Sequence, residues 1–163
     1  MGFKLVRPAE SFLHPGTFLK KFTYSDDNER QYVRQVAKLA FNRKTRIHLL
    51  ANEANIPCGF TALSISHLLD QSCLVVDYLF TSKEHRGISF DDLGMKISEY
   101  LVDFAINTAR EINDRAPIRY IALMPGHDKL ISFYGSWGFK NLDKTGEGLG
   151  VWQEWIENKL RQR

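Results

Sequence analysis

The sequence predicts a mixed α/β fold in which a largely antiparallel central sheet is flanked by helices. Short apolar segments bounded by turn residues predict strands, two of which form a hairpin in the first half of the chain. In the second half, a strong apolar strand, a long amphipathic helix and another buried strand follow one another. This order predicts a parallel pair of strands joined by a crossover helix. We expect residues 1–163 to form one domain, because no repeat or linker divides them.

The first half of the chain is expected to supply a strand, a helix and the hairpin. A short strand is predicted at FKLVRP, followed by the turn-rich segments HPGTF and YSDDN. Asp27 or Asn28 can cap a helix that extends to about Asn42. The hairpin is expected from its first strand, its turn and its second strand, RIHLLANE, ANIPCG and FTALSIS.

The second half begins with the apolar strand CLVVDYLFT, which ends at Thr81. A loop leads into a long helix, MKISEYLVDFAINTAREIN, whose apolar residues recur at helical spacing. A strand, a short helix that ends near Gly138 and a last strand are expected at IRYIALM, HDKLISFYGSWGF and EGLGVWQEWIENK. The predicted order of elements is therefore β-α-β-β-β-α-β-α-β.

The charge of the chain is mildly basic, at +3 with a pI of about 8.9, which is below that of a dedicated nucleic-acid-binding domain. Its distribution is more informative. Arg30, Arg34 and Lys38 are spaced four residues apart and form a basic stripe on the predicted helix. The opposite face is apolar and consists of Val33, Val36, Ala37 and Ala40. The stripe is either the solvated face of an amphipathic helix or a surface for a polyanion or an acidic substrate.

Cysteine, histidine and hydrophobic patterns restrict the class of protein. Cys58 and Cys73 lack CxxC spacing and lie in apolar segments, which indicates two buried thiols in a reducing compartment. The five histidines show no metal-ligand spacing, so we expect no metal. No apolar run approaches the ~20 residues of a membrane span, and the N-terminus lacks the apolar core of a signal peptide. We therefore expect a cytoplasmic protein that does not bind membranes.

The junction between the apolar strand and the long helix is suited to binding a phosphate group. A helix N-terminus presents free backbone N–H groups and the positive end of the helix dipole. Glycine lets the backbone approach a phosphate closely, and Arg86 adds a fixed positive charge. An Arg-Gly pair before a helix is common in loops, so this feature alone does not specify a function.

Two segments together resemble the landmarks of the GCN5-related N-acetyltransferase (GNAT) superfamily. The segment LFTSKEHRG resembles the strand Leu-x-Val, four spacer residues and the first Arg-Gly of Arg-Gly-x-Gly-x-Gly, with Thr81 in place of the Val. Downstream, ISFYGSWGF resembles Phe-Tyr-x-x-x-Gly-Phe. The resemblance covers nearly the whole chain and implies a GNAT-like fold.

The resemblance also implies which residues bind an acyl-CoA, most simply acetyl-CoA. Main-chain groups of Leu79, Phe80 and Thr81 are expected to bind the pantetheine arm. The loop amides, Arg86 and Gly87 are expected to bind the pyrophosphate.

Two further residues are implied in catalysis. Tyr134 is expected near the thioester sulfur, where it protonates the leaving thiolate. Asp77 is expected to order the water that deprotonates the amine, because a carboxylate is a suitable base for that step. The alternatives are a paired strand residue for Asp77 and a hydrogen-bonded core aromatic for Tyr134.

The loop ISFDD departs from the family pattern. Without a gap, Ser89 and Asp91 replace the second and third glycines. With three extra residues, Gly94 aligns with the last glycine and becomes a further cofactor-binding residue, while Asp91 and Asp92 lie in a bulge. This alignment fits better, because LGMKISEYLVDFA then matches the start and length of the family helix. In a third option, Ser89 caps the helix with Asp92 as its third residue.

All three alignments place carboxylates near the expected pyrophosphate. They would weaken cofactor binding unless they point outward or pair with Lys83, Arg86 or Lys96. His127, at a position where many members have Asn, is a further departure.

The function implied by the resemblance is N-acylation of a primary amine by direct attack on acetyl-CoA in a ternary complex. A small molecule or a protein is the first expectation for the acceptor. A second expectation for the acceptor is an aminoacyl-tRNA, which toxins of this superfamily acetylate. These toxins also begin with a basic helix and continue with a hairpin that CGFTALSIS resembles. In that case Arg30, Arg34 and Lys38 would contact tRNA phosphates. A third reading is an inactive binding or interaction module, because of the acidic loop. A homodimer is among the assemblies that the resemblance implies.

Overall fold

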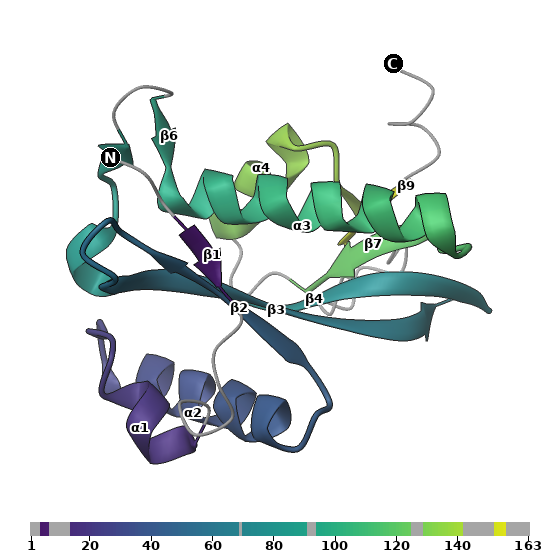
Figure 1. The fold of residues 1–163 in the computed structure, drawn as a ribbon. Helices are drawn as coiled ribbons and strands as arrows, with labels where there is room; N and C mark the ends of the chain where they lie inside the picture. The colour runs from purple at the N-terminus through teal and green to yellow at the C-terminus, as the bar shows by residue number, and fades with distance from the viewer. Residues whose placement is uncertain are drawn as a thin grey trace. The chain divides into compact units, whose positions relative to one another are not determined.

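The structure contains the predicted strands and helices in the predicted order, with several short elements between them (Figure 1). It is a computed structural model, and it describes residues 4–6, 14–68, 70–90, 94–124, 129–141 and 152–155. The elements of the first half are β1 (Lys4–Val6), α1 (Pro15–Leu19), α2 (Asp27–Phe41), β2 (Arg46–Ala51), β3 (Pro57–Leu68) and β4 (Gln71–Thr81). Those of the second half are the 3₁₀ turn η1 (Lys83–His85), β5 (Ser89–Phe90), β6 (Met95–Lys96), α3 (Ile97–Arg115), β7 (Tyr120–Leu123), α4 (Lys129–Ser136), β8 (Lys140–Asn141) and β9 (Trp152–Trp155).

The pairing of the strands confirms the predicted fold class. Strands β1, β2, β3 and β4 are neighbours in chain order, and the series continues from β4 through β7 and β9 to β8. Pairs β1–β2, β2–β3, β7–β9 and β8–β9 are antiparallel. Strands β4 and β7 are parallel and are connected through α3, as the strand-helix-strand pattern predicted.

The chain divides into two compact units. The first consists of Met1–Ser64 and Asp77–Ala105, and the second of Ile65–Val76 and Ile106–Arg163. Strands β3 and β4 and helix α3 therefore contribute residues to both units.

In the first unit, side chains from both faces of the strands enter hydrophobic clusters. The predicted apolar face of α2 is buried and packs with α1 and with one strand face (Figure 1). Leu49 belongs to this cluster, whereas the adjacent Leu50 packs with Ile97 and Leu101 of α3. Successive strand residues point to opposite faces, so one strand serves both layers.

Three local expectations in the first unit are wrong. HPGTF is not a turn but forms most of α1, and Pro15 occupies the first helical turn, where its missing N–H costs no hydrogen bond. The N-cap of α2 is Asp26 instead of Asp27 or Asn28, because the Asp26 carboxylate accepts the N–H of Glu29 at 2.8 Å. Strand β3 begins at Pro57, within the segment predicted as a turn.

The acidic loop contains a hairpin that the sequence did not predict. Ser89 pairs with Lys96 and Phe90 pairs with Met95, so β5 and β6 form a two-stranded sheet. Ser89 is therefore extended strand and not the cap of α3, which begins at Ile97. Glu99 Oε2 accepts the N–H of Lys96 at 2.7 Å at the start of that helix.

In the second unit, all four residues of β7 are buried, as expected for a strand covered on both faces. Helix α4 is followed by Gly138, whose φ of +92° suits glycine at a helix C-terminus, as predicted. Both cysteines are free and buried, also as predicted. Among the described residues, no helix is long and apolar enough to span a bilayer.

Candidate active site

Strand β4 extends beyond its parallel partner. Its register with β7 runs from Cys73 opposite Tyr120 to Val76 opposite Leu123. Strand β4 then continues for Asp77–Thr81, a stretch that no described strand pairs on the β7 side. An unpaired strand edge can hydrogen-bond to an extended ligand as an added strand would. The predicted pantetheine-binding residues Leu79, Phe80 and Thr81 lie in this stretch.

A close approach between β3 and β4 fixes the path of this stretch. A Cβ atom on Gly59 would lie 2.4 Å from the carbonyl oxygen of Phe80 and 3.3 Å from Thr81 Cα. Next to it, Ser82 N–H donates to the Cys58 carbonyl at 2.9 Å. Only glycine allows this contact between the backbones.

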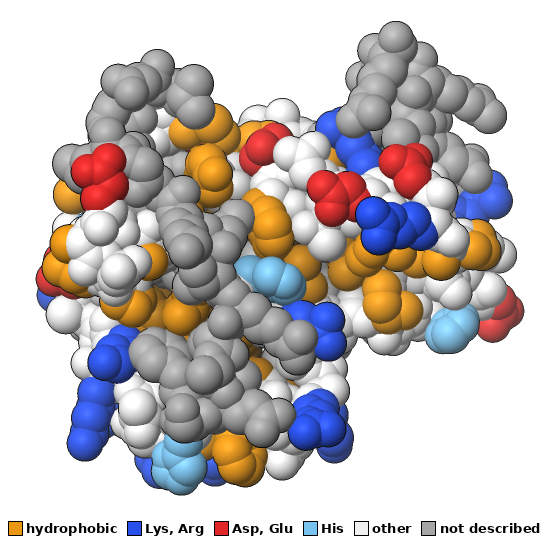
Figure 2. Space-filling model, in the orientation of Figure 1, with side chains coloured by type: hydrophobic (Ala, Val, Ile, Leu, Met, Phe, Trp, Pro, Cys, Tyr) orange, Lys and Arg blue, Asp and Glu red, His pale blue; other side chains and the backbone are white. Residues whose placement is uncertain are grey.

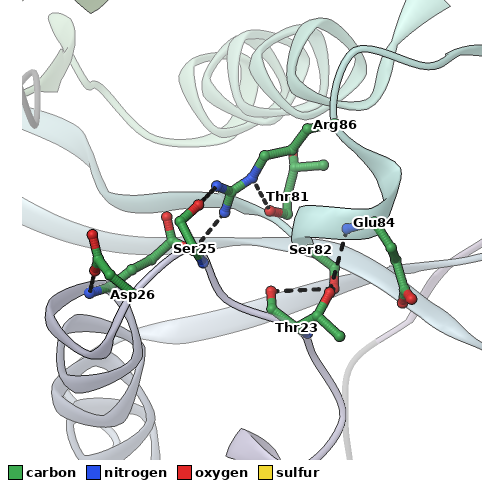
Figure 3. Close-up of polar contacts among 8 residues, drawn as sticks. Thr23, Ser25, Asp26, Thr81, Ser82, Glu84 and Arg86 are labelled. Atoms are coloured by element: carbon green, nitrogen blue, oxygen red, sulfur yellow. Dashed lines mark hydrogen bonds and ion pairs between the residues drawn. The ribbon is translucent and has the colours of Figure 1, made fainter.

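Arg86 lies in the turn after β4 and is held by groups from two parts of the chain (Figure 3). Its Nε donates to the Thr81 carbonyl at 2.9 Å, its Nη1 donates to Ser25 Oγ, and its Nη2 lies 2.6 Å from Glu29 Oε1. The guanidinium also lies over the Phe80 ring, 5.7 Å from its centroid. Arg86 therefore joins the predicted cofactor turn to the start of α2.

Thr23 makes a second set of contacts with the same turn (Figure 3). Its N–H donates to Ser82 Oγ at 2.9 Å, and its carbonyl accepts the N–H of Lys83 at 3.0 Å. Its hydroxyl accepts the N–H of Glu84 at 3.3 Å. Ser82 is fully buried. The loop between α1 and α2 and the turn after β4 thus form one hydrogen-bonded assembly.

Two glycines of the predicted pyrophosphate loop adopt left-handed backbone conformations. Gly87 has φ of +72° and Gly94 has φ of +64°. A Cβ atom at either position would meet no atom within 4 Å, so these glycines are required by conformation and not by crowding. Gly94 lies in the turn of the β5–β6 hairpin, three residues before α3 instead of at the helix start.

Asp77 is exposed and lies against a buried threonine. The Thr45 hydroxyl lies 2.6 Å from Asp77 Oδ2 and 3.1 Å from the Leu63 carbonyl. The hydroxyl has one proton, and the shorter contact to the carboxylate orients the Asp77 side chain. The Asp77 carboxylate is thus open to solvent and also accepts a hydrogen bond from Thr45.

Tyr134 belongs to the second unit, whereas Asp77 and residues 79–87 belong to the first. Its ring packs against Phe133 and Phe139, with centroids 5.2 and 6.0 Å apart. Burial raises the pKa of the Tyr134 phenol to about 12. The phenol therefore keeps its proton at neutral pH.

The basic stripe is exposed along α2. Arg30, Arg34 and Lys38 are all exposed, as are the neighbouring Arg43, Lys44 and Arg46. Figure 2 shows lysine and arginine side chains in the lower part of the view, where Figure 1 places α1 and α2. Phe41, at the end of the helix, is 52% exposed and contacts the His14 ring edge-on.

Some predicted features lie outside the described residues, namely Asp91, Asp92 and His127. Arg86, one of the cations expected to pair with the two aspartates, bonds to Glu29. Within the described ranges, no group of three His, Cys, Asp or Glu side chains could hold a metal ion.

The sequence analysis missed the contacts that surround Arg86. Glu29, Ser25 and Thr23 lie about 60 residues before the turn, and no local pattern joins segments so far apart. One signal was available for Glu29: Asp26-x-x-Glu29 has the spacing of a capping box. Gly59 was visible only as a turn glycine.

Comparison of the sequence with family models and with curated proteins found no match. Comparison of the structure with solved structures found many similar folds. The crystal structure of AtaTR bound with AcCoA has 15% sequence identity and a TM-score of 0.78, covering 99% of this chain and 98% of that chain. AtaT complexed with acetyl-methionyl-tRNAfMet has 14% identity, a TM-score of 0.74 and 99% coverage of both chains. A Tyr-to-Phe mutant of KacT has 12% identity, a TM-score of 0.75 and full coverage of both chains.

At these identities the likeness concerns the fold. It extends over essentially the whole chain, and it agrees with the strand order and the parallel strand-helix-strand unit described above. The chain has the fold of the GCN5-related N-acetyltransferase superfamily.

Proposed function

We propose that the protein is an N-acetyltransferase that transfers the acetyl group of acetyl-CoA to a primary amine by direct attack in a ternary complex. The observation that carries this proposal is the edge of β4 from Asp77 to Thr81, which no described strand pairs on the β7 side. A pantetheine arm carries amide groups and can hydrogen-bond to such an edge as an added strand would. AtaTR, a structural neighbour, is described as bound with AcCoA.

In this proposal, main-chain groups of Leu79, Phe80 and Thr81 bind the pantetheine arm. The diphosphate binds at the turn that follows, next to Arg86, Gly87 and Gly94. The left-handed conformation of Gly87 lets the backbone N–H groups face a ligand without a Cβ in the way. Arg86 has five N–H donors, and its three described bonds leave capacity for a phosphate oxygen.

The reaction needs one base and one acid. Asp77, oriented by Thr45, accepts the proton of the attacking ammonium through a water molecule. The amine nitrogen then forms a bond to the acetyl carbon as the carbon–sulfur bond breaks, and it releases its second proton to water, from which the Tyr134 phenolate regains a proton after it has served as the acid. Tyr134 donates its proton to the leaving thiolate; its phenol is protonated at neutral pH, as any tyrosine with a pKa of about 10 or above is. Cys58 and Cys73 take no part, because burial raises the pKa of both thiols and disfavours a nucleophilic thiolate.

Isothermal titration with acetyl-CoA tests the cofactor part of this proposal. We expect saturable binding, whereas no heat at millimolar ligand would favour an inactive GNAT-fold module. The Tyr134→Phe variant should bind acetyl-CoA like the unmodified protein and lower turnover by about 10²-fold or more, the usual contribution of a general acid. Unchanged turnover would remove Tyr134 from the mechanism.

For the acceptor, we propose the α-amino group of an aminoacyl-tRNA. The exposed stripe of Arg30, Arg34 and Lys38 supports this choice, because three cations spaced along one helix suit a row of phosphates. AtaT, a protein of the same fold, has been solved with acetyl-methionyl-tRNAfMet. A small molecule or a protein amine is the alternative.

Reversal of the three stripe charges to Glu separates these acceptors. We expect aminoacyl-tRNA binding to weaken. The slope of the logarithm of the binding constant against the logarithm of the salt concentration should become shallower by about 2 to 3, because three phosphate contacts are lost. Acetyl-CoA affinity should not change, since these residues are not among the proposed cofactor ligands. If the parent protein binds tRNA without salt dependence, or if the reversal has no effect, the acceptor is not a tRNA.

A further inference from the structure

We propose that Glu29 sets the affinity of the protein for acetyl-CoA by neutralising Arg86. This inference rests on the proposed function and adds a residue that neither the sequence pattern nor the fold assigns. Glu29 Oε1 lies 2.6 Å from Arg86 Nη2, and the two side chains are only 22% and 35% exposed. A diphosphate that binds beside Arg86 therefore meets a guanidinium whose charge a carboxylate already balances.

The negative charge of Glu29 is not needed for its structural role at the start of α2. Its Oε1 accepts the N–H of Ser25 at 3.1 Å, and its own N–H donates to Asp26 Oδ1 at 2.8 Å. A glutamine side chain can provide the same acceptor in a capping box. The charge is therefore separable from the cap.

Arg86 stays in place when this charge is removed. The Thr81 carbonyl and the Phe80 ring hold the guanidinium independently of Glu29, and Ser25 Oγ, whose residue also bonds to Glu29, adds a further contact. A glutamine oxygen can still accept from Nη2. The main consequence of Glu29→Gln is thus the loss of one negative charge close to the proposed diphosphate site.

The direction and size of the effect follow from Coulomb's law. Two like charges several ångströms apart in a partly solvated site repel with an energy that corresponds to about a 3- to 10-fold change in affinity. We expect Glu29→Gln to tighten acetyl-CoA binding by about this factor, and the gain to shrink as salt rises. If Glu29 only positions Arg86, the same variant would bind more weakly or without change.

The experiment measures binding of CoA and of acetyl-pantetheine, which lacks the diphosphate, by isothermal titration at two salt concentrations. Glu29→Gln should tighten CoA binding and leave acetyl-pantetheine binding unchanged. Asp26→Asn is the matched control, because it removes one charge from the same helical turn, keeps an oxygen for the cap and does not contact Arg86 in any described bond. It should change CoA affinity by less than Glu29→Gln does.

A double variant completes the test. In an Arg86→Gln background, Glu29→Gln should still tighten CoA binding, because the repulsion between the carboxylate and the diphosphate does not require the guanidinium. Loss of the effect in that background would mean that Glu29 acts only by positioning Arg86, and would overturn the inference. Equal or weaker CoA binding by Glu29→Gln, with an unchanged melting temperature, would overturn the inference while the proposed function stands. Absence of CoA binding by the unmodified protein would overturn both.

Discussion

The turn after β4 and the helix that carries Tyr134 are held by different forces. The turn is held by polar bonds: Arg86 and Ser82 each contact the loop between α1 and α2, about 60 residues away. Tyr134 is held mainly by aromatic burial between Phe133 and Phe139. Hydrogen bonds fix direction and depend on individual atoms, whereas aromatic packing tolerates the loss of a hydroxyl. The two regions should therefore respond differently to substitution.

The largest expected difference between the two regions is the loss of stability when a glycine in each is replaced by alanine. Gly59→Ala should destabilise the protein by about 3 kcal/mol or more, because its Cβ would collide with the backbone oxygen of Phe80. It should also weaken acetyl-CoA binding, since Phe80 and Thr81 would shift. Gly135→Ala in α4 is the control: its Cβ meets nothing within 4 Å, and alanine favours a helix. Urea denaturation checks both, and equal effects would contradict the close approach of β3 and β4.

A smaller difference in stability is expected when a serine in each region is replaced by alanine. Ser82→Ala removes a fully buried hydroxyl that accepts from Thr23 N–H, and should cost about 1–2 kcal/mol. Ser132→Ala, in an exposed position of α4, should lie within about 0.5 kcal/mol of the parent protein. Denaturant midpoints measure both values. A neutral Ser82→Ala would show that Thr23 does not depend on this bond.

The smallest expected effect is the pH dependence of stability that Tyr134 contributes. Its pKa is about 12 in the folded state and about 10 in the unfolded chain, so the folded state favours the neutral phenol. This contribution is present below pH 10 and is lost as the pH rises toward 12. Between pH 9 and pH 11, the free energy of unfolding of the parent protein should fall by about 1 kcal/mol more than that of the Tyr134→Phe variant. Parallel curves for the two proteins would show that Tyr134 titrates normally.

Local patterns in the sequence predicted most of the longer strands and helices. Short apolar strands and the amphipathic α2 and α3 were predictable because each pattern is local and repeats with the period of its own element. The buried α2 face and the left-handed Gly138 were predicted for the same reason. The hairpin β5–β6 was not, because two-residue strands carry too short a pattern to distinguish them from a loop.

The sequence by itself determined the order of the longer strands and helices, the apolar and basic faces of α2, and the positions of Asp77, Arg86 and Tyr134 along the chain. The tertiary structure alone decided what Arg86 contacts, why Gly59 must be glycine, and where β4 extends beyond β7. The reason is physical. Periodicity and capping depend on neighbours within a few residues, whereas these contacts join residues about 20 to 60 positions apart that only folding brings within bonding distance.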